Sequence, residues 1–107
     1  ELLIFKYIVC ATFSMSFTYK VFSVVRKISR GQVMTYKQVA RFAGNERAYR
    51  AVGNILHKNP DMRSIPCHRV VRSDYSLSEG YAFGGKAVQK KKLEQEGLTF
   101  SGNKIVL

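Results

Sequence analysis

Acidic residues are scarce in this chain: seven Asp and Glu stand against eighteen Lys and Arg, which gives a formal net charge of +11 over 107 residues. So strong a positive charge favours a polyanionic partner, and nucleic acid is the commonest one. Internal repeats and low-complexity runs are also absent, while 46% of the residues are hydrophobic. Because that apolar content is enough to form a core, the sequence excludes a disordered basic tail and predicts one folded domain.

Cysteine is equally scarce, since Cys10 and Cys67 are the only two and lie far apart in the sequence. They could in principle form one disulfide, but a lone bridge without a secretion signal is not expected. A reducing compartment is therefore predicted: the cytoplasm or nucleoid, or the nucleus in a eukaryote. Two separated Cys and two His have no paired ligand spacing, so no metal site is expected.

No apolar run is long enough to cross a bilayer. The segment ELLIFKYIVCATF, residues 1–13, is interrupted by Lys6 and lacks the basic start and small-residue cleavage site of a signal peptide. We therefore expect no membrane partner. The chain divides into residues 1–14, an N-terminal extension without an assigned role, and residues 15–107, a single domain. The plain structural interpretation of the extension is a strand or hydrophobic strap on the core.

Two helices are predicted from apolar periodicity and end signals. After Ser16, a good N-cap, apolar residues recur at helical spacing up to Gly31, which can end the helix. A short extended piece follows. The next helix then begins with the capping box formed by Thr35 and Gln38 and ends at Gly44.

A third helix is predicted over residues 45–59, with Asn45 as its cap, because the residue before Pro60 avoids helical geometry. Two helices joined by so short a turn have the form of a helix-turn-helix. A solvated basic face would look the same on a lone helix, but the paired helix and the whole-chain charge favour DNA binding. The candidate contact residues on its polar side and its small positions are Arg47, Arg50, Asn54, Lys58, Ala51 and Gly53.

The C-terminal part predicts a helix over residues 86–97, with a run of three lysines, followed by two short strands around the Ser-Gly-Asn turn at 101–103. The expected fold class is mainly α: a helix-turn-helix or winged-helix-like DNA-binding domain with a small C-terminal β element.

The segment SIPCHRVVRS, residues 64–73, places Cys67 directly before His68. It is compatible with an inert thiol in a core turn, half of a metal site, or a nucleophile with its base. A thiol attacks only as thiolate, so it needs a cation or a base nearby. Glu96 is the candidate acid that would orient His68, following the general nucleophile–base–orienter arrangement. Arg69 and Arg72 are expected to favour the thiolate at Cys67.

The string NPDMRSIPCHRVV, preceded by GQVMTYKQVARFAGNERAYRAVG and followed by GYAFGG and EQEG, resembles the 6-O-alkylguanine-DNA alkyltransferase family, the methylated-DNA–protein-cysteine methyltransferases. The resemblance covers residues 17–97 and matches only the family's C-terminal DNA-binding, active-site domain. The short alkyltransferase-like proteins also have only this domain. They lack the reactive cysteine, whereas Cys67 is present here.

The resemblance implies a role for each matched residue. Cys67 would take the alkyl group from guanine irreversibly, without cofactor or metal. His68, held by Glu96, would remove the thiol proton through water. Asn59 would brace the turn that bears the cysteine. Tyr36 would donate a hydrogen bond toward the extruded base.

The resemblance also implies a base pocket and a DNA surface. The pocket would be lined by Tyr36, Val70, Tyr81, Ala82 and Phe83, the last of which could disfavour large alkyl groups. Arg50 would enter the base stack, and Arg69 would join the helix residues named above as a DNA contact. The expected partner is double-stranded DNA containing alkylated guanine, bound by a monomer. The alternatives are a non-catalytic lesion-recognition protein and, more distantly, a winged-helix regulator.

One departure from the family pattern is visible in the loop after Cys67. Tyr75 stands where a turn glycine is expected, and the loop before Gly84 and Gly85 is about one residue longer.

Overall fold

The computed structural model describes residues 16–107, so the expected extension at residues 1–14, and Cys10 within it, lie outside the described residues. The described part is mainly helical with two small sheets, which confirms the predicted fold class. Its elements, in chain order, are α2 Phe17–Arg26, β1 Met34–Thr35, α3 Tyr36–Phe42, η1 Glu46–Ala48, α4 Tyr49–His57, η2 Cys67–Arg69, β2 Val70–Val71, α5 Gly85–Gln95, β3 Thr99–Ser101 and β4 Lys104–Val106.

Helix α2 begins as predicted, because the Ser16 hydroxyl accepts a hydrogen bond from the Tyr19 amide at 3.2 Å. It ends earlier than predicted, at Arg26, and Gly31 lies in the turn beyond it. The amides of Lys27 and Ile28 bond to carbonyls three residues back, which tightens and closes the last turn. Ile28 is thereby buried in the core.

The capping box of α3 is present as predicted: Thr35 accepts from the Gln38 amide, and the Gln38 side chain accepts from the Thr35 amide. Gly44 ends this helix with φ +106°. Its amide bonds to the Arg41 carbonyl, and the next amide, of Asn45, reaches back to the Ala40 carbonyl at 2.9 Å. This paired closure is the Schellman motif, which requires a residue that tolerates positive φ.

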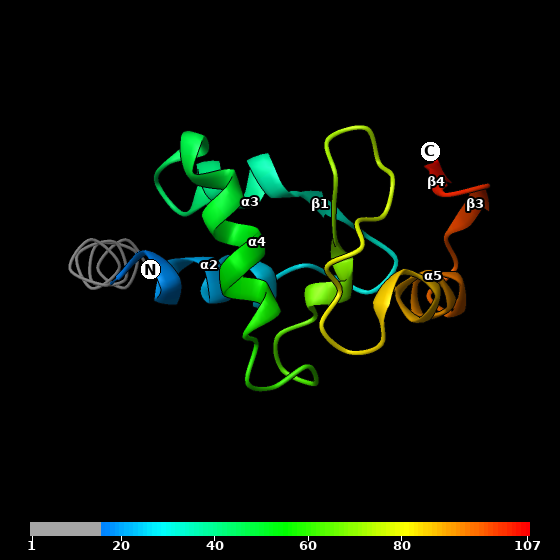
Figure 1. Ribbon diagram of the computed structural model, residues 1–107, viewed down its shortest axis with the longest axis horizontal. Coiled ribbons are helices and arrows are strands. Elements are labelled where there is room, and N and C mark those ends of the chain that lie inside the picture. Colours follow the sequence, from blue (N-terminus) through cyan, green and yellow to red (C-terminus); the bar gives the residue numbers. More distant parts are fainter. Residues whose placement is uncertain (1–15) are drawn as a thin grey trace, which may run out of the picture.

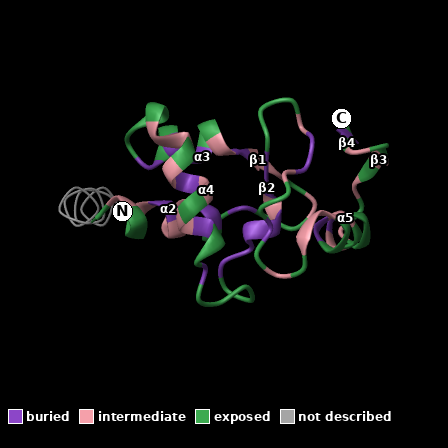
Figure 2. Ribbon diagram, viewed as in Figure 1, coloured by how far each residue is buried: buried purple, intermediate pink, exposed green. Residues whose placement is uncertain are grey.

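The helix predicted over residues 45–59 starts with the 3-10 turn η1, capped by the Asn45 side chain, and continues as α4. Val52 and Leu56 are buried against the first helices, while Arg50 and Asn54 are exposed, as their helical spacing predicted. Figure 2 shows this division along α4. Helices α2, α3 and α4 lie together at one end of the molecule (Figure 1).

A parallel pairing of β1 with β2, not predicted from the sequence, joins Met34 to Val70 and Thr35 to Val71. Strand β1 leads into the helix-turn-helix, and β2 immediately follows the turn that contains Cys67. The pairing therefore fixes the cysteine turn against the start of α3.

Helix α5 and the β3–β4 hairpin lie at the other end of the molecule (Figure 1). Here Val71, Leu77, Leu93 and Ile105 form a second small core cluster. Gly97, with φ +98°, closes α5 by a second Schellman motif, in which the Leu98 amide bonds to the Leu93 carbonyl at 3.1 Å. This closure holds Glu96 at the helix end.

Tyr75 adopts φ +65°, the left-handed conformation that its place at an expected glycine position implied.

Between Ser16 and Leu107, no helix combines the length and the apolar character that a membrane crossing needs.

Candidate active site

The cysteine turn is held by backbone and amide hydrogen bonds. Cys67 opens the 3-10 helix η2 directly after Pro66, and its amide bonds to the Ile65 carbonyl at 2.8 Å. The buried Asn59 donates through Nδ2 to the same carbonyl at 2.8 Å, while its Oδ1 accepts from the Asp61 amide at 2.9 Å. Asn59 thus ties the end of α4 to the segment that carries the thiol.

His68 and Glu96 meet across 28 residues of sequence: Nε2 of His68 lies 2.8 Å from Oε2 of Glu96. An ionised carboxylate only accepts hydrogen bonds, so Nε2 must carry the proton. The lone pair of a neutral His68 is then on Nδ1, where it can accept a proton from another group. The Glu96 carboxylate therefore holds His68 in the tautomer whose Nδ1 can act as a base.

The charge states of the pair follow from burial and from Arg69. Burial by itself raises the pKa of Glu96, but hydrogen bonds from Arg69 and His68 outweigh it and lower that pKa to about 2. Burial lowers the pKa of His68, although Glu96 acts in the opposite direction. At neutral pH the carboxylate is therefore ionised and the imidazole is neutral.

Arg69, which was predicted to contact DNA, makes hydrogen bonds inside the protein. Its Nε and Nη2 donate to the two oxygens of Glu96 at 2.9 and 2.8 Å, and its Nη1 donates to the Ile28 carbonyl at 2.7 Å. These bonds engage all three guanidinium nitrogens. Arg69 anchors Glu96 and links the site to the end of α2.

Cys67 is 6% exposed and faces a hollow of only about 10 Å³, which holds at most one water molecule. Burial raises the pKa of the thiol above its ordinary 9.0, against the opposing effects of the Asn59 side chain and the Lys92 charge. The expectation that Arg69 and Arg72 favour the thiolate is therefore wrong: the nearby cation is Lys92. The resting thiol is neutral and needs a base.

We expect the rate of Cys67 alkylation by iodoacetamide to keep rising above pH 9, because burial raises the pKa of this thiol beyond 9.0. The rate is measured by mass spectrometry of the Cys67 peptide at a series of pH values. Denatured protein serves as the reference and should level off at lower pH. Lys92→Met should slow the reaction at a fixed pH, since it removes the opposing positive charge. A plateau near neutral pH would contradict this assignment.

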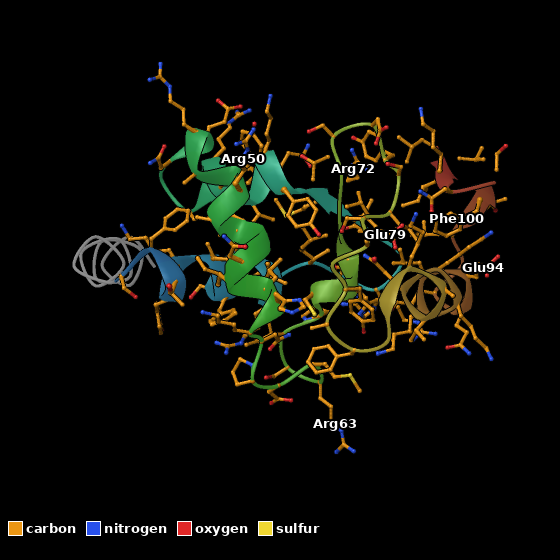
Figure 3. The ribbon with its side chains drawn as sticks, in the orientation of Figure 1. Arg50, Arg63, Arg72, Glu79, Glu94 and Phe100 are labelled. Carbon is orange, nitrogen blue, oxygen red and sulfur yellow. The ribbon has the colours of Figure 1, made fainter. Side chains whose placement is uncertain are left out.

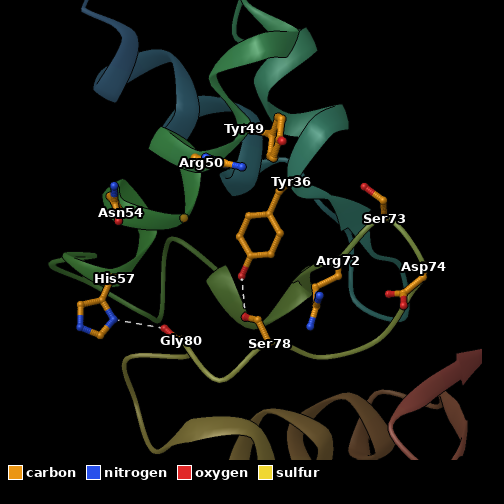
Figure 4. Close-up of a pocket in the computed structure, with 11 residues that line it drawn as sticks. Tyr36, Tyr49, Arg50, Asn54, His57, Arg72, Ser73, Asp74, Ser78 and Gly80 are labelled. Atoms are coloured by element: carbon orange, nitrogen blue, oxygen red, sulfur yellow. Dashed lines mark hydrogen bonds between the residues drawn. The ribbon is translucent and has the colours of Figure 1, made fainter.

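A larger hollow, of about 580 Å³, lies beside the cysteine hollow, between α4 and the loop after β2. Tyr36 stands in it and shares a hydrogen bond of 3.1 Å with the Ser78 hydroxyl (Figure 4). His57 bonds through Nδ1 to the Gly80 carbonyl at 3.1 Å. Tyr36, Gly53 and Gly80 line both hollows.

The predicted DNA-facing residues of the second helix are placed as follows. Arg50, Gly53 and Asn54 line the larger hollow, whereas Arg47 and Lys58 are exposed outside it and Ala51 is half-buried. The Arg50 guanidinium carbon lies 5.9 Å from the centroid of the Tyr49 ring. Arg50 and Arg72 are in the upper half of the molecule in Figure 3, whereas Arg63 is at its lower edge.

The predicted base pocket is only partly assembled. Tyr36, Tyr81 and Ala82 line the hollow at Cys67. Val70 does not, because it is fully buried in the core beside the helices. Phe83 does not either: it packs edge-on against Tyr81, with ring centroids 5.8 Å apart, and against the same core.

Two residues of α5 that the sequence did not single out border the thiol. Gln89 lines the cysteine hollow, and Lys92 donates to the Tyr81 hydroxyl at 2.7 Å. Gln89 and Lys92 are three residues apart, and Lys92 and Glu96 are four apart, so all three side chains share one helix face. This spacing could have revealed both residues in the sequence. Ser78 and His57, in the larger hollow, carried no sequence signal. Within residues 16–107, no cluster of three His, Cys, Asp or Glu side chains is suited to a metal ion.

The family model of the 6-O-methylguanine DNA methyltransferase DNA-binding domain matches residues 16–98. The methylated-DNA–protein-cysteine methyltransferase of Mus musculus is 43% identical over 84 residues, which are 78% of this chain and 39% of that protein. The enzyme of the same name from Methanothermobacter thermautotrophicus is 42% identical over 83 residues, 78% of this chain and 45% of that protein. The chain thus spans less than half the length of these relatives.

Among solved structures, S. pombe Atl1 in complex with damaged DNA containing O6-carboxymethylguanine superposes with a TM-score of 0.70 at 31% identity, covering 83% of this chain and 84% of that one. The O6-methylguanine methyltransferase of Mycobacterium tuberculosis gives 0.68 at 32% identity, covering 78% and 49%.

The fold and the site together define a small helix-turn-helix domain in which a buried thiol directly precedes the histidine of a His–Glu pair. The chain belongs to the family of 6-O-methylguanine DNA methyltransferase DNA-binding domains.

Proposed function

We propose that this protein, acting as a monomer on double-stranded DNA, repairs 6-O-alkylguanine by moving the alkyl group to Cys67. The observation that carries the proposal is the buried thiol directly before a histidine whose Nε2 is held 2.8 Å from Glu96. A neutral thiol that directly precedes a neutral, oriented histidine in the chain is suited to deprotonation at the moment of reaction, once water links the two side chains.

The proposed chemistry is a displacement at carbon. His68 accepts the thiol proton at Nδ1 through one water molecule, and the imidazolium formed is stabilised by the Glu96 carboxylate. The sulfur attacks the alkyl carbon, an S–C bond forms and the O–C bond breaks. The electron pair of the O–C bond passes to the base, which takes up a proton from water and remains in the strand as guanine, while the imidazolium returns its proton to water. The thioether cannot revert, so each molecule reacts once, without metal or cofactor.

The alkyl group must leave the base stack to reach the buried sulfur, so the nucleotide must be flipped out. The larger hollow beside α4 supplies a place of entry, and the three residues that it shares with the cysteine hollow lie between the two. Because the inner hollow holds only about 10 Å³, the wall formed by Gly80, Tyr81 and Ala82 must move for a base to enter.

The direct test is the intact mass of the protein after incubation with duplex DNA containing 6-O-methylguanine. We expect a gain of one methyl group per molecule, mapped to Cys67, while unmodified DNA produces no change. Binding without any gain in mass would overturn the transfer proposal.

That outcome would support the second candidate, a lesion-recognition protein that binds alkylated DNA and recruits repair partners. The observation in its favour is the similarity to Atl1, which extends over 84% of that chain and was found in a complex with damaged DNA.

We expect Arg50→Ala to slow methyl transfer from duplex DNA on the order of 10- to 100-fold, but to change the reaction with the free alkylated base little. Arg50 borders the entry hollow, and a side chain that fills the stack matters only when there is a stack to open. Single-turnover rates on both substrates measure the effect. Arg63→Ala, which changes an exposed arginine outside the hollow and on the opposite side of the molecule (Figure 3), is the matched control and should leave the duplex-to-base ratio nearly unchanged. Equal losses on both substrates would mean that Arg50 supports the fold.

A further inference from the structure

The β3–β4 hairpin lies outside the part of the chain that matches the family. The family model ends at residue 98, whereas β3 begins at Thr99 and β4 ends at Val106. Membership of the family therefore assigns this hairpin no role. Its own contacts and charge indicate what it does.

The hairpin is fixed on the loop that follows β2. The Ile105 amide donates to the Tyr75 carbonyl at 2.9 Å, and an isolated antiparallel bridge pairs Lys104 with Ser76. Ile105 is buried in the second core cluster, whereas Lys104 and Val106 on either side of it are exposed. Because side chains alternate along a strand, the burial of Ile105 points Lys104 away from the core.

The loop that carries the hairpin also borders the larger hollow beside α4. Arg72 and Asp74 of this loop line the hollow together with Arg50 of α4 (Figure 4). In Figure 1, β4 lies in the upper half of the molecule, as do the tip of this loop and the N-terminal end of α4. The hairpin therefore extends the surface that α4 presents to DNA in the proposed function.

The charges where the hairpin meets this loop leave a positive excess. Hydrogen bonds from Ser76 lower the pKa of Asp74, and the positive charges of Lys104 and Arg72 lower it further, so these three charges lie close together. Oδ1 of Asp74 accepts from the Ser76 amide and hydroxyl at 3.1 and 2.6 Å. Within residues 16–107, neither Lys104 nor Arg72 takes part in an ion pair. Two cations against one carboxylate leave a net positive charge.

Lys104 differs in this respect from lysines of the neighbouring helix α5. Lys90 donates to the Gly102 carbonyl at 3.1 Å, and Lys92 donates to the Tyr81 hydroxyl at 2.7 Å. Both ammonium groups are thus engaged inside the protein. Lys104 is the only charged side chain of residues 99–107, and it is exposed. It is therefore the group through which the hairpin can attract a polyanion.

We propose that the β3–β4 hairpin is a second DNA contact, in which Lys104 binds a backbone phosphate beside the segment of the duplex that α4 occupies. This inference rests on the DNA binding of the proposed function. A phosphate contact fixes the position of a protein on the duplex without reading its sequence. Such a contact suits a protein that has to bind a lesion in any sequence.

The first test measures the affinity of Lys104→Gln for duplex DNA containing 6-O-methylguanine, by fluorescence anisotropy over a series of salt concentrations. We expect the affinity to fall about fivefold at about 100 mM salt and the slope of log affinity against log salt to become shallower by about 0.9, as the loss of one phosphate contact implies. Lys104→Glu should bind more weakly still, because a carboxylate repels the phosphate. Arg63→Gln removes the same charge at the lower edge of the molecule in Figure 3 and should change neither quantity.

The second test locates the contact by ethylation interference, which identifies the phosphates whose ethylation weakens binding. The unaltered protein should require at least one phosphate that Lys104→Gln does not, while the other positions coincide. The same affinity and the same phosphates for both proteins would overturn the inference and leave alkyl transfer standing. Binding without any gain in mass would overturn the proposed transfer, but the comparison of affinities would still decide the role of the hairpin.

Discussion

Replacing Cys67 by serine is expected to abolish methyl transfer while leaving DNA binding nearly intact. A hydroxyl is far less readily ionised than a thiol, and His68, with its pKa lowered by burial, is too weak a base to deprotonate it. The substitution changes one buried atom at the wall of a small hollow and removes no helix contact with DNA. Intact mass after incubation with 6-O-methylguanine DNA measures transfer, and fluorescence anisotropy measures binding to the same duplex.

Cys10→Ser is the matched control for this experiment and should react as the unaltered protein does. Cys10 lies in an apolar run of the sequence and has no histidine next to it that could act as its base. A methyl group mapped to Cys10, or residual transfer in Cys67→Ser, would contradict the assignment of the nucleophile. Loss of DNA binding in Cys67→Ser would mean that the sulfur supports the fold.

Glu96→Ala is expected to lower the free energy of unfolding by about 3 kcal/mol, the lower end of the range for breaking a buried ion pair. The carboxylate accepts two hydrogen bonds from Arg69 and lies 2.8 Å from His68, with side-chain exposures of 7% for Glu96 and 16% for Arg69. Its removal leaves the Arg69 guanidinium largely buried with one acceptor. Chemical denaturation at neutral pH measures the loss.

Glu94→Ala is the matched control, because Glu94 is an exposed acid on the same helix and should cost no more than about 0.5 kcal/mol. Adding Arg69→Ala to Glu96→Ala should destabilise less than the sum of the single substitutions, since each already breaks the pair. Strict additivity in this double-mutant cycle would show that Arg69 and Glu96 do not interact.

The contribution of Glu96 to the free energy of unfolding also depends on pH. Its pKa is about 2 in the folded protein, against an ordinary 4.5, so the unfolded chain binds the proton first as pH falls. The stabilisation is complete above pH 4.5 and is lost toward pH 2. The difference in unfolding free energy between the unaltered protein and Glu96→Ala should therefore shrink over this interval. A constant difference down to pH 2 would contradict the ionised pair.

The sequence by itself determined the local structure of the first half of the chain. The Ser16 cap, the Thr35–Gln38 box and the stop at Gly44 were all predicted, because each depends on residues three or four positions apart. The family resemblance implied the neighbourhood of Cys67, His68 and Glu96, and Tyr75 was correctly identified at a glycine-like position. The caps, the stop at Gly44 and the Tyr75 conformation are encoded in short segments.

Only the tertiary structure decided which charges are available and where the thiol lies. Arg69 was predicted to contact DNA, and nothing in the sequence indicated that it would bond to Glu96. The end of α5 brings Glu96 to it and engages two of its donors inside the protein. Lys92 and Gln89 approach Cys67 only because α5 packs against η2 and β2. Burial, which raises the pKa of the thiol and closes the base pocket, is a property of all the packed elements together. No local pattern of residues encodes it, because the free energy of desolvation depends on neighbours that are distant in sequence.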